Sequence, residues 1–404
     1  MLVERHYIKG TKDIKQLCQL SKQLYNKCNY LMRQAWLDKQ RLPDVGILIN
    51  AVHELDCFKQ LHNTKTAKQT IWQCLTDWSN FKKARNAYFK DKSKFVKCPK
   101  PPHYKKELAQ VIFYNETIRK KPLKSGIITP TNDCFKIKSD KIFKQVVITP
   151  KSFGFIVEVQ YKKEKHKTKL DKTKFCCIDI GLNNLATITQ DQHQPLLVNG
   201  RIVKSINQWY NKNKSKTASK KRYFRLENYF HHVSKFIIEN CKQNNIGRIV
   251  IGKNDGWKTG INLGKRTNQA FCSVPYYKLF LKINYKAQRE GIDVIYVEES
   301  YTSQSSFFDN DPLPIYDKKA NHPKFSGNRK CRGLYVCGDG YAVNADVNGS
   351  LNIGRKVIPE CVAKQRIGDR SLSARPVRVN PLKSFMPVVR DQMEVVDDSN
   401  FCCL

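Results

Sequence analysis

The stretch FCCIDIGLNNLATIT, residues 175–189, decides the fold of the C-terminal half of the chain. An apolar run is followed by turn residues and then by β-branched residues, which predicts a buried strand, a turn and a second strand. Asp179 comes directly after the apolar run Phe175–Ile178. A carboxylate there is costly to bury unless a cation or hydrogen-bond donors compensate it. An Asp in a turn after a strand is also a common turn former or cap, so this simpler interpretation stays open.

The elements that follow this stretch alternate between strands and helices. The pattern predicts a hairpin over 190–200, a helical region over 204–244, a strand over 246–252, a helix over about 271–290 and a strand over 293–299. Continuous apolar strands such as IGRIVIG are typical of parallel sheets that are covered on both faces. The alternation therefore predicts an α/β domain with a mixed sheet.

Acidic residues stand at the ends of several of these elements. Glu298 and Glu299 end the strand DVIYVEE, and Asp346 begins a last helix that runs to about Arg355. Together with Asp179, these carboxylates can converge in one cleft from distant sequence positions. Carboxylate oxygens are preferred ligands of Mg²⁺, and two such ions promote phosphodiester hydrolysis. The sequence therefore suggests a two-metal nuclease site, although each acidic residue taken alone is more often structural.

The N-terminal half has a different pattern. Residues 2–9 predict a strand. Three helices are expected over 13–39, 44–61 and 66–92, because apolar residues recur there every three or four positions. The prolines of Lys97–Pro102 end the helical pattern, because proline lacks a backbone donor. Short β-rich segments over 108–165 then predict a small antiparallel barrel or sandwich.

These patterns divide the chain into five regions. The charged stretch 161–174 predicts a linker, and a domain boundary is placed there. The Pro-, Gly- and Asp-rich region 303–340 reads as a loop inserted into the second domain, and the weakly patterned tail is compatible with disorder. The expected regions are 1–12 (first strand of the β domain), 13–96 (helical domain), 97–170 (β domain), 171–357 (α/β domain) and 358–404 (tail).

The charge of the chain points to a polyanionic partner. Among 404 residues, 73 Lys and Arg face 35 Asp and Glu, which gives a net charge of +38. Like charges at this density repel one another unless a polyanion such as nucleic acid is bound. A solvated helix face is the simpler alternative for each basic cluster. The candidate nucleic-acid-binding residues are Lys82, Lys83, Arg85, Lys90, Lys214, Lys220, Lys221, Arg222, Arg225 and Lys330.

Several classes of protein are excluded by the composition. The N-terminus lacks the apolar core of a signal peptide, and no apolar run approaches the ~18 residues of a membrane span. The 15 cysteines are scattered and odd in number, which predicts reduced thiols in a cytoplasmic protein. No C-x-x-C pair occurs, and this argues against a zinc site.

Three segments resemble the RuvC-like nuclease motifs of TnpB proteins, which are transposon-encoded and related to type V CRISPR effectors. They are CIDIGLNNLAT (177–187), EESYTSQSS (298–306) and NADVNGSLNIGRK (344–356). The resemblance covers 175–357 and extends more loosely to the N-terminal half. The three motifs occur in the family's order, and the pattern Asp346, Asn348, Asn352, Ile353 is characteristic of it.

The resemblance implies a fold and an activity. The fold would be an α/β and α+β multidomain one, with an RNase H-like RuvC nuclease domain and an N-terminal wedge-like β-barrel that carries a helical recognition insertion. The protein would be a prokaryotic, nucleoid-associated RNA-guided DNA endonuclease that binds one guide RNA per protein. Guide pairing would select a double-stranded DNA target beside a short motif. Mg²⁺ held by Asp179, a glutamate and Asp346 would support cleavage.

The glutamate of this site departs from the family pattern. In typical members it ends the strand that matches Arg248–Ile251, but here Gly252 follows that strand. Either the nuclease is inactive or another carboxylate takes the place. Because side chains alternate along a strand, one of Glu298 and Glu299 is expected to face the metals. Many members have proline at the second position, so we favour Glu299 over Glu298, with Asp255 as third choice.

A second departure concerns zinc. Typical members carry two C-x-x-C pairs after the Thr-Ser-Gln motif, whereas here only Cys331 and Cys337 follow. Together with His322 they could form a partial zinc site. Their spacing is poor, so we expect the loop to fold without metal around Phe307, Phe308, Tyr316, Phe325 and Tyr335. The expected cofactor is therefore Mg²⁺ alone.

Three functions compete at this point. The first is the active RNA-guided endonuclease, and the second is an RNA-guided DNA-binding protein that has lost cleavage and acts like a repressor. The missing glutamate motivates the second. The third is a DNA transposase, which would also need carboxylates and Mg²⁺ but would not carry a discrete bound RNA.

Overall fold

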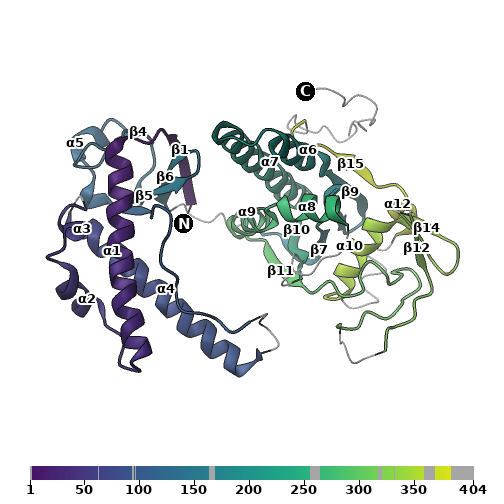
Figure 1. The fold of residues 1–404 in the computed structure, drawn as a ribbon. Coiled ribbons are helices and arrows are strands. Elements are labelled where there is room, and N and C mark those ends of the chain that lie inside the picture. The colour runs from purple at the N-terminus through teal and green to yellow at the C-terminus, as the bar shows by residue number, and fades with distance from the viewer. Residues whose placement is uncertain are drawn as a thin grey trace. The chain divides into compact units, whose positions relative to one another are not determined.

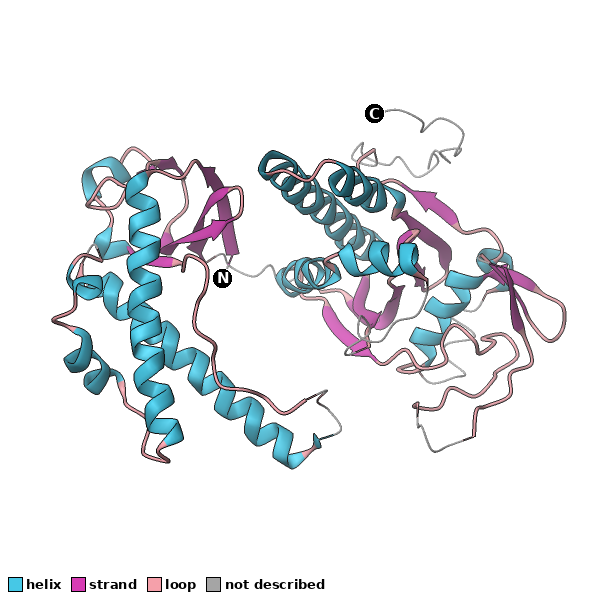
Figure 2. Cartoon of the chain, in the orientation of Figure 1, coloured by secondary structure: helices cyan, strands magenta, loops and turns pink. Residues whose placement is uncertain are grey.

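The computed structural model describes residues 2–61, 63–92, 95, 97–162, 169–254, 264–316, 321–331, 333–358 and 369–383. The chain divides into two compact units, Met1–Lys163 and Glu164–Leu404. Figure 1 follows the chain by colour, and Figure 2 separates helices from strands. The division falls inside the charged stretch 161–174. None of the helices in the described ranges is long and apolar enough to cross a membrane.

The N-terminal unit is built on a four-stranded antiparallel sheet in the order β1-β6-β5-β2. The strands are β1 (Leu2–Ile8), β2 (Val111–Tyr114), β5 (Phe143–Lys151) and β6 (Gly154–Tyr161). The first strand pairs along its whole length with β6, from Leu2 opposite Tyr161 to Ile8 opposite Phe155. The residues between β1 and β2 are therefore a long helical excursion from one sheet. Among the described strands, β1 and β2 are the edges, so the pairings give an open sheet where a barrel or sandwich was expected.

Two short strands stay outside this sheet. β3 (Ile127–Ile128) and β4 (Ile137–Lys138) pair with each other as a ribbon. With two residues each, they offer too few ladder hydrogen bonds to extend the larger sheet. The short helices η2 (Asn115–Thr117) and α5 (Lys120–Leu123) lie between β2 and β3.

The helical excursion consists of α1 (Lys12–Leu37), α2 (Val45–Val52), α3 (Asp56–Lys59) and α4 (Thr64–Lys90). Thr11 and Asn63 cap the two long helices, because their side chains accept from backbone N–H groups of the first turn. Buried Trp78 joins α4 to α1 by donating to Asn29 Oδ1 at 2.8 Å. The single helix expected over 44–61 was wrong, since residues 53–55 break it into α2 and α3.

The C-terminal unit contains a six-stranded sheet in the order β11-β10-β7-β8-β9-β15. β8 runs antiparallel to both β7 and β9, whereas β10 and β11 run parallel to β7, and β15 runs parallel to β9. The strands are β7 (Asp171–Asp179), β8 (Asn184–Gln190), β9 (His193–Asn199), β10 (Ile246–Gly252), β11 (Asp293–Val297) and β15 (Val377–Val379). The mixed sheet with helices that the sequence predicts is thus confirmed.

The central strand β7 is buried on both faces, because successive side chains point to opposite sides. Cys176 and Ile178 belong to the core beneath the helices α6 (Arg201–Lys212), α7 (Lys216–Gln243) and α9 (Tyr276–Arg289). Phe175 and Cys177 belong to a second core with α10 (Ala345–Arg355). Where one helical region was expected over 204–244 there are two helices, since Ser215 caps a new one by accepting from Ala218 N. A further short helix, α8 (Lys265–Ser273), precedes α9.

The inserted region 303–340 is more regular than its composition indicates. Its end contributes β12 (Asn328–Cys331) and β13 (Leu334–Val336) to a three-stranded sheet that is completed by β14 (Ala342–Asn344), just after the region. Part of the tail is also ordered into the domain, because β15 pairs parallel with β9 and α12 (Arg370–Ser373) precedes it. The expectation that the α/β domain ends near residue 357 was therefore wrong for residues 369–383.

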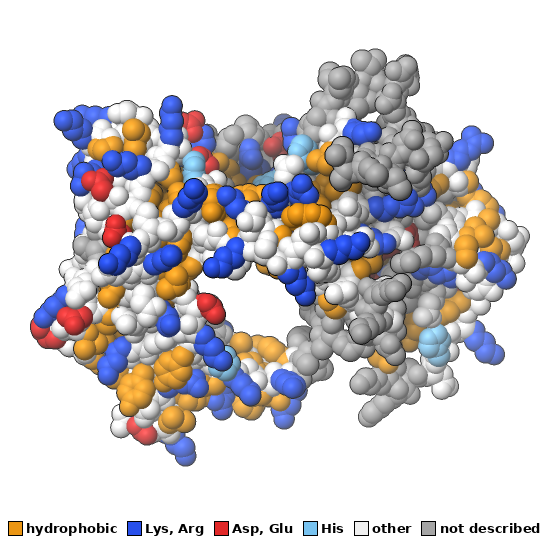
Figure 3. All heavy atoms as spheres, turned by 45° about the horizontal axis from the view of Figure 1, so that its top comes forward, with side chains coloured by type: hydrophobic (Ala, Val, Ile, Leu, Met, Phe, Trp, Pro, Cys, Tyr) orange, Lys and Arg blue, Asp and Glu red, His pale blue; other side chains and the backbone are white. Residues whose placement is uncertain are grey.

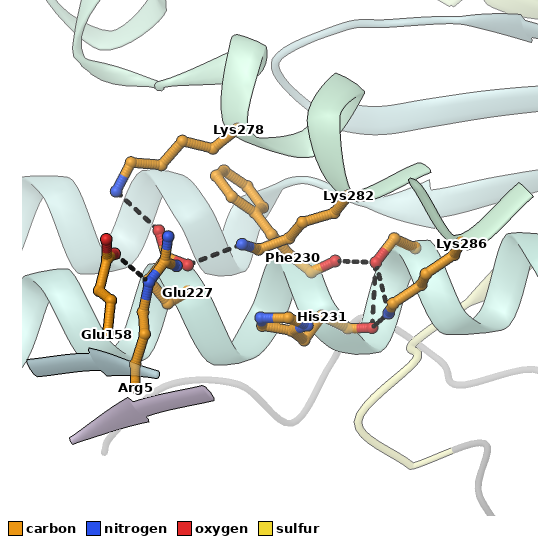
Figure 4. A network of polar contacts seen from close by, with 9 residues as sticks. Arg5, Glu158, Glu227, Phe230, His231, Lys278, Lys282 and Lys286 are labelled. Carbon is orange, nitrogen blue, oxygen red and sulfur yellow. Dashed lines mark hydrogen bonds and ion pairs between the residues drawn. The ribbon is translucent and has the colours of Figure 1, made fainter. Parts of the chain in front are cut away.

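An ionic network holds α7 to α9. Glu227 on α7 accepts from Lys278 at 2.6 Å and from Lys282 at 2.7 Å, and the Lys282 side chain is only 7% exposed (Figure 4). Burial alone would raise the pKa of Glu227, but the two lysines outweigh it and hold the pKa at about 2. One turn further along α9, Lys286 donates to the carbonyl of His231 and to Ser234 Oγ, at 2.7 Å each.

Candidate active site

Asp179 is the last residue of the central strand β7, opposite Thr187 of β8. Its half-buried carboxylate lies against α10, because a Cβ on Gly349 would come within 3.1 Å of Asp179 Oδ2. Glycine in the middle of a helix weakens it by roughly 0.5–1 kcal/mol. Gly349 is thus placed where the helix must pass close to the carboxylate.

Asp346 reaches the same region from the first turn of α10. Asn344 caps this helix, since its side chain accepts from the N–H groups of Asp346 and Val347. The Asp346 carboxylate accepts from Asn184 Nδ2 at 2.8 Å and from Arg329 Nη2 at 3.2 Å. Two donors from β8 and β12 thus orient this side chain.

Glu299 follows β11 by two residues, and its carboxylate occupies space beside β10. A Cβ on Gly252 would lie 2.8 Å from Glu299 Cγ and closer still to Glu299 Oε1. Gly252 ends β10, where the resemblance places a glutamate, and Glu299 fills the space that a side chain at 252 would need. Asn254 fixes its backbone by accepting from Glu299 N at 2.7 Å. Among the described residues, the buried Glu299 Oε1 has no hydrogen-bond partner.

Glu298 has other contacts. Its carboxylate accepts from Lys356 Nζ at 2.9 Å and from both the backbone N–H and the hydroxyl of Ser300. Burial acts to raise the pKa of Glu298, but Ser300 and Lys356 outweigh it and the pKa is lowered. Adjacent glutamates therefore differ sharply, since the first is fully engaged in an ion pair and the second is buried beside Asp179.

The three carboxylates act on one another electrostatically. Burial and the charge of Asp346 raise the pKa of Asp179 to about 7, against the opposing effect of Arg329. Burial and the charge of Asp179 raise the pKa of Glu299 to about 8. Groups that hinder each other's ionisation in this way favour a bound cation, which would relieve the repulsion.

The chemistry of the set fits a hard divalent cation such as Mg²⁺. All donors are carboxylate oxygens, and one of them, Glu299 Oε1, is buried without a partner in the part of the chain that the structure describes. In the described ranges, however, no group of three His, Cys, Asp or Glu side chains is placed to hold a metal ion. The third choice from the sequence, Asp255, lies outside the described residues.

The two asparagines of the last motif anchor the loop that begins at Glu299. Asn348 donates to Ser305 O at 2.8 Å and accepts from Phe307 N at 3.0 Å. One turn later, Asn352 donates to Thr302 O and again to Ser305 O. The loop in turn holds Glu299, whose carbonyl accepts from Thr302 Oγ1 at 2.9 Å. The motif thus connects the helix of Asp346 to the loop of Glu299.

Most candidate nucleic-acid-binding residues are exposed. Lys and Arg side chains are spread over the face in Figure 3, with Asp and Glu side chains at few places. Arg222 is different, because it donates to Asn207 Oδ1 at 2.7 Å and to Ser273 O at 2.8 Å, so it joins α7 to its neighbours. The exposed candidates are Lys82, Lys83, Lys90, Lys214, Lys221, Arg225 and Lys330, while Arg85 and Lys220 are partly buried.

The inserted region packs through aromatic side chains. His322 lies edge-on to Tyr301, with ring centroids 5.2 Å apart, and Phe307 and Phe308 contact each other in the same way. Cys331 is exposed on β12, whereas Cys337 is buried. The carboxylates of Asp309 and Asp311 accept backbone N–H groups from Gly338 and from Ser326, which closes the loop on itself.

Comparison with known proteins agrees with the three motifs. Residues 276–353 match the family model described as the Cas12f1-like TNB domain. The TnpB-like protein ORF457 of Acidianus two-tailed virus is 21% identical over 416 residues, which span 86% of this chain and 84% of that protein. The chain thus resembles proteins of the TnpB/type V effector family. The resemblance stated from the sequence is thereby confirmed.

Solved structures of type V effectors were also matched. A Cas12f1–sgRNA–target DNA complex gives a TM-score of 0.35 at 12% identity, covering 89% of this chain and all of that one. A CRISPR–Cas12f ternary complex gives a TM-score of 0.32 at 13% identity, covering 84% and 80%.

Three residues of the site could not be assigned a role from the sequence. Arg329 belongs to a basic loop, Asn184 lies within the first motif, and Gly252 follows a strand where a glutamate was expected. Their function depends on contacts with residues 17 to 162 positions away. The one sequence signal for them was the glycine at a position where the family has a carboxylate.

Proposed function

We propose that this chain is an RNA-guided DNA endonuclease whose single RuvC-like site consists of Asp179, Glu299 and Asp346. Similarity to the TnpB/type V effector family supports a nuclease. The observation that carries the proposal is the carboxylate of Glu299, which lies in the space left by Gly252 and keeps one buried oxygen without a partner among the described residues. Glu299 would thus replace the glutamate that the family carries at the end of β10.

The strand order supports an RNase H-like assignment for the C-terminal unit. An antiparallel β7-β8-β9 meander continues on the other side of β7 into the parallel strands β10 and β11. The three carboxylates come from the ends of β7 and β11 and from α10, which packs on this sheet. Such a placement brings residues from three distant motifs to one edge.

Asp179, Glu299 and Asp346 would hold Mg²⁺, which when bound would supply a nucleophilic water and stabilise the charge of the leaving oxygen. The chain's other residues position these ligands. Arg329 and Asn184 orient Asp346. The guanidinium of Arg329 is half-exposed beside the carboxylates, where a phosphate could accept hydrogen bonds from it. The Asn348 and Asn352 contacts fix the loop of Glu299.

Guide RNA and target double-stranded DNA are the proposed partners, with one protein per guide RNA. The net charge of +38 and exposed lysines in both units support a long polyanionic ligand. Base pairing between guide and target would supply sequence specificity, while the protein would hold the nucleic-acid backbone. Affinity should then fall steeply with salt concentration.

The test begins with the RNA that the expressed chain retains. This RNA is sequenced, its guide segment is replaced, and a matched plasmid is incubated with the purified complex in Mg²⁺. The proposal predicts guide-dependent cleavage that disappears in the Asp179→Ala/Asp346→Ala double variant. Cleavage that survives the double substitution would remove the proposed site, and a chain that retains no discrete RNA would favour the transposase alternative.

A catalytically inactive, repressor-like protein is the second candidate. Gly252 favours it, because the carboxylate typical of the family is missing from β10. This alternative predicts guide-dependent binding of the matched target with no cleavage in Mg²⁺ or Mn²⁺. Binding and cleavage measured on the same complex separate the two.

A further inference from the structure

The segment 97–109 of the N-terminal unit is an extended strap fixed along α1. It has no regular secondary structure (Figure 2), and Pro99, Pro101 and Pro102 lack backbone donors. Three α1 side chains hold it instead. Asn26 pairs with both backbone groups of Lys105, at 2.7 and 3.0 Å, much as a neighbouring strand would. Asn29 Nδ2 and Arg33 Nη1 both donate to Pro102 O.

These three residues share one face of α1, since they are spaced by three and four positions. The strap is therefore held by the helix at three of its backbone positions, Pro102, Lys105 and Ala109, the last donating from its N–H to Cys18 O at 3.2 Å. Such fixation lowers the entropy that a loop loses when it binds a ligand. A proline-rich segment held in this way presents its remaining side chains in set positions.

An open groove lies between this strap, α1 and α4. Its volume is about 510 Å³, and its lining includes Tyr25, Asp77, Asn80, Phe81, Lys100 and Tyr104. Small-molecule sites in proteins typically have volumes of ~300–1,000 Å³. The groove is thus large enough for a single planar ring system with its attached groups.

The chemistry of the groove combines aromatic rings with cations. Tyr104 is 43% exposed although Arg33 lies 5.4 Å from its ring centroid, and Lys105 lies 4.3 Å from the centroid of Tyr25. Asp77 is held by the Tyr25 hydroxyl at 2.6 Å and by Lys105 at 3.5 Å. The carboxylate and the exposed amide of Asn80 are groups that pair with the edge of a nucleobase.

The strap itself is strongly basic. Lys97, Lys100, Lys105 and Lys106 stand within ten residues, against the single acid Glu107. Lysines at this density attract phosphates, and neutral or cationic ligands gain nothing from them. A ligand that offers a planar ring, a polar edge and a phosphate is a nucleotide.

We propose that this groove binds one unpaired nucleotide of a single-stranded nucleic acid. The base stacks on Tyr104, its polar edge meets Asp77 and Asn80, and its phosphate contacts Lys100. A base within a duplex is stacked and paired, so a duplex cannot place one base in the groove. The groove belongs to the N-terminal unit and shares no residue with the carboxylate cluster. Its nucleotide binding can therefore be tested independently of the nuclease proposal.

The test uses the full chain without guide or metal and two decamers, one of RNA and one of DNA, each carrying a single 5-iodouracil. After irradiation, the crosslinked peptides are identified and quantified by mass spectrometry. We expect a crosslink within residues 97–109. Stacking of one base contributes ~1–3 kcal/mol, so Tyr104→Ala should reduce its yield about tenfold at subsaturating protein, while Tyr104→Phe keeps it because the ring remains.

Tyr277→Ala serves as the matched control, since this tyrosine is 61% exposed on α9 of the other unit. It should leave the crosslink in 97–109 unchanged. A higher crosslink yield with the RNA or the DNA decamer shows which nucleic acid supplies the nucleotide. Equal yields indicate that the groove recognises the base and phosphate that both share. Three results would overturn the proposal. The first is a wild-type crosslink that is found only outside the strap, and the second is an unchanged yield in Tyr104→Ala. The third is equal labelling of the strap when the iodouracil strand is supplied as a blunt-ended duplex.

Discussion

Replacing Gly252 with alanine adds one methyl group at the point where β10 meets the Glu299 side chain. The new Cβ would lie 2.6 Å from Ile353 Cδ1 and 2.8 Å from Glu299 Cγ, distances that no real methyl group tolerates. Either the side chain of Ile353 on α10 or the side chain of Glu299 must move. Overpacking of this kind costs ~1–3 kcal/mol of stability, and a displacement of about 1 Å at a catalytic group costs roughly 10²-fold in rate.

The assay measures unfolding and cleavage on the same preparations. Urea titration gives the free energy of unfolding, and single-turnover cleavage of a matched plasmid gives the rate. For Gly252→Ala we expect a loss of about 2 kcal/mol and a rate roughly 100-fold lower. Gly333→Ala is the control, because a Cβ at Gly333 meets nothing within 4 Å, and it should change stability by no more than about 0.5 kcal/mol.

A double variant tests the reason for the loss. Gly252→Glu combined with Glu299→Ala returns a carboxylate to β10 and removes the one it would collide with, so cleavage should recover above that of Glu299→Ala alone. The reasoning is refuted if Gly252→Ala matches the wild type in both stability and rate. If stability falls while the rate is unchanged, the contact exists but Glu299 takes no part in cleavage.

Three further predictions follow from the packing. The pKa of Glu227 in the folded protein is about 2, against an ordinary value of 4.5, so its ion pairs should contribute about 3 kcal/mol to stability. This stability is present above pH 4.5 and is lost as the pH falls toward 2. Urea titrations from pH 7 to 3 should show the loss, and Glu227→Gln should abolish it. Asn348→Ala removes two hydrogen bonds from a fully buried position, so the free energy of unfolding should fall by about 2 kcal/mol, whereas an unchanged midpoint would contradict the anchoring of the Glu299 loop. Lys221→Ala should reduce RNA affinity and lower the slope of log affinity against log salt concentration by about 1, without changing stability. Arg222→Lys should instead cost ~1–3 kcal/mol of stability, because it leaves the partners of Arg222 unpaired. The reverse pattern in filter binding and urea titration would show that Arg222 is the RNA contact.

Local patterns in the sequence predicted most of the secondary structure. The buried strand before Asp179 was readable because an unbroken apolar run can be buried on both faces, as β7 is. The long helices could be predicted from their apolar periodicity. The break at residues 53–55 and the short strands β12–β14 were missed, since elements of two to four residues depend on tertiary pairing and carry no period of their own.

The pairing of β15 with β9 could not be predicted either. Three residues, Val377–Val379, add a strand at the sheet edge, and nothing in VRV distinguishes them from other parts of the tail. The order of the strands in the sheet was likewise beyond the sequence, because it depends on which faces of α7, α9 and α10 become buried.

The site was predictable as a set of residues but not as a geometry. Alternation along the strand indicated that only one of Glu298 and Glu299 would face the cleft, and the contacts of Glu298 with Lys356 and Ser300 support Glu299 as that residue. The complementarity of Gly252 and Glu299 required coordinates, because β10 and β11 are joined by about 40 residues of intervening chain. Motif spacing carries no information about which side chain fills a neighbouring space.

The most direct test of the central claim compares Glu299→Gln with Glu298→Gln. Both substitutions remove one charge without changing the size of the side chain, at adjacent positions of the same loop. In guide-directed cleavage with Mg²⁺, the account predicts that Glu299→Gln cuts at least 100-fold more slowly while still binding the matched target, and that Glu298→Gln cuts within a few-fold of the wild type. A Glu299→Gln complex that cuts as fast as the wild type would contradict the account.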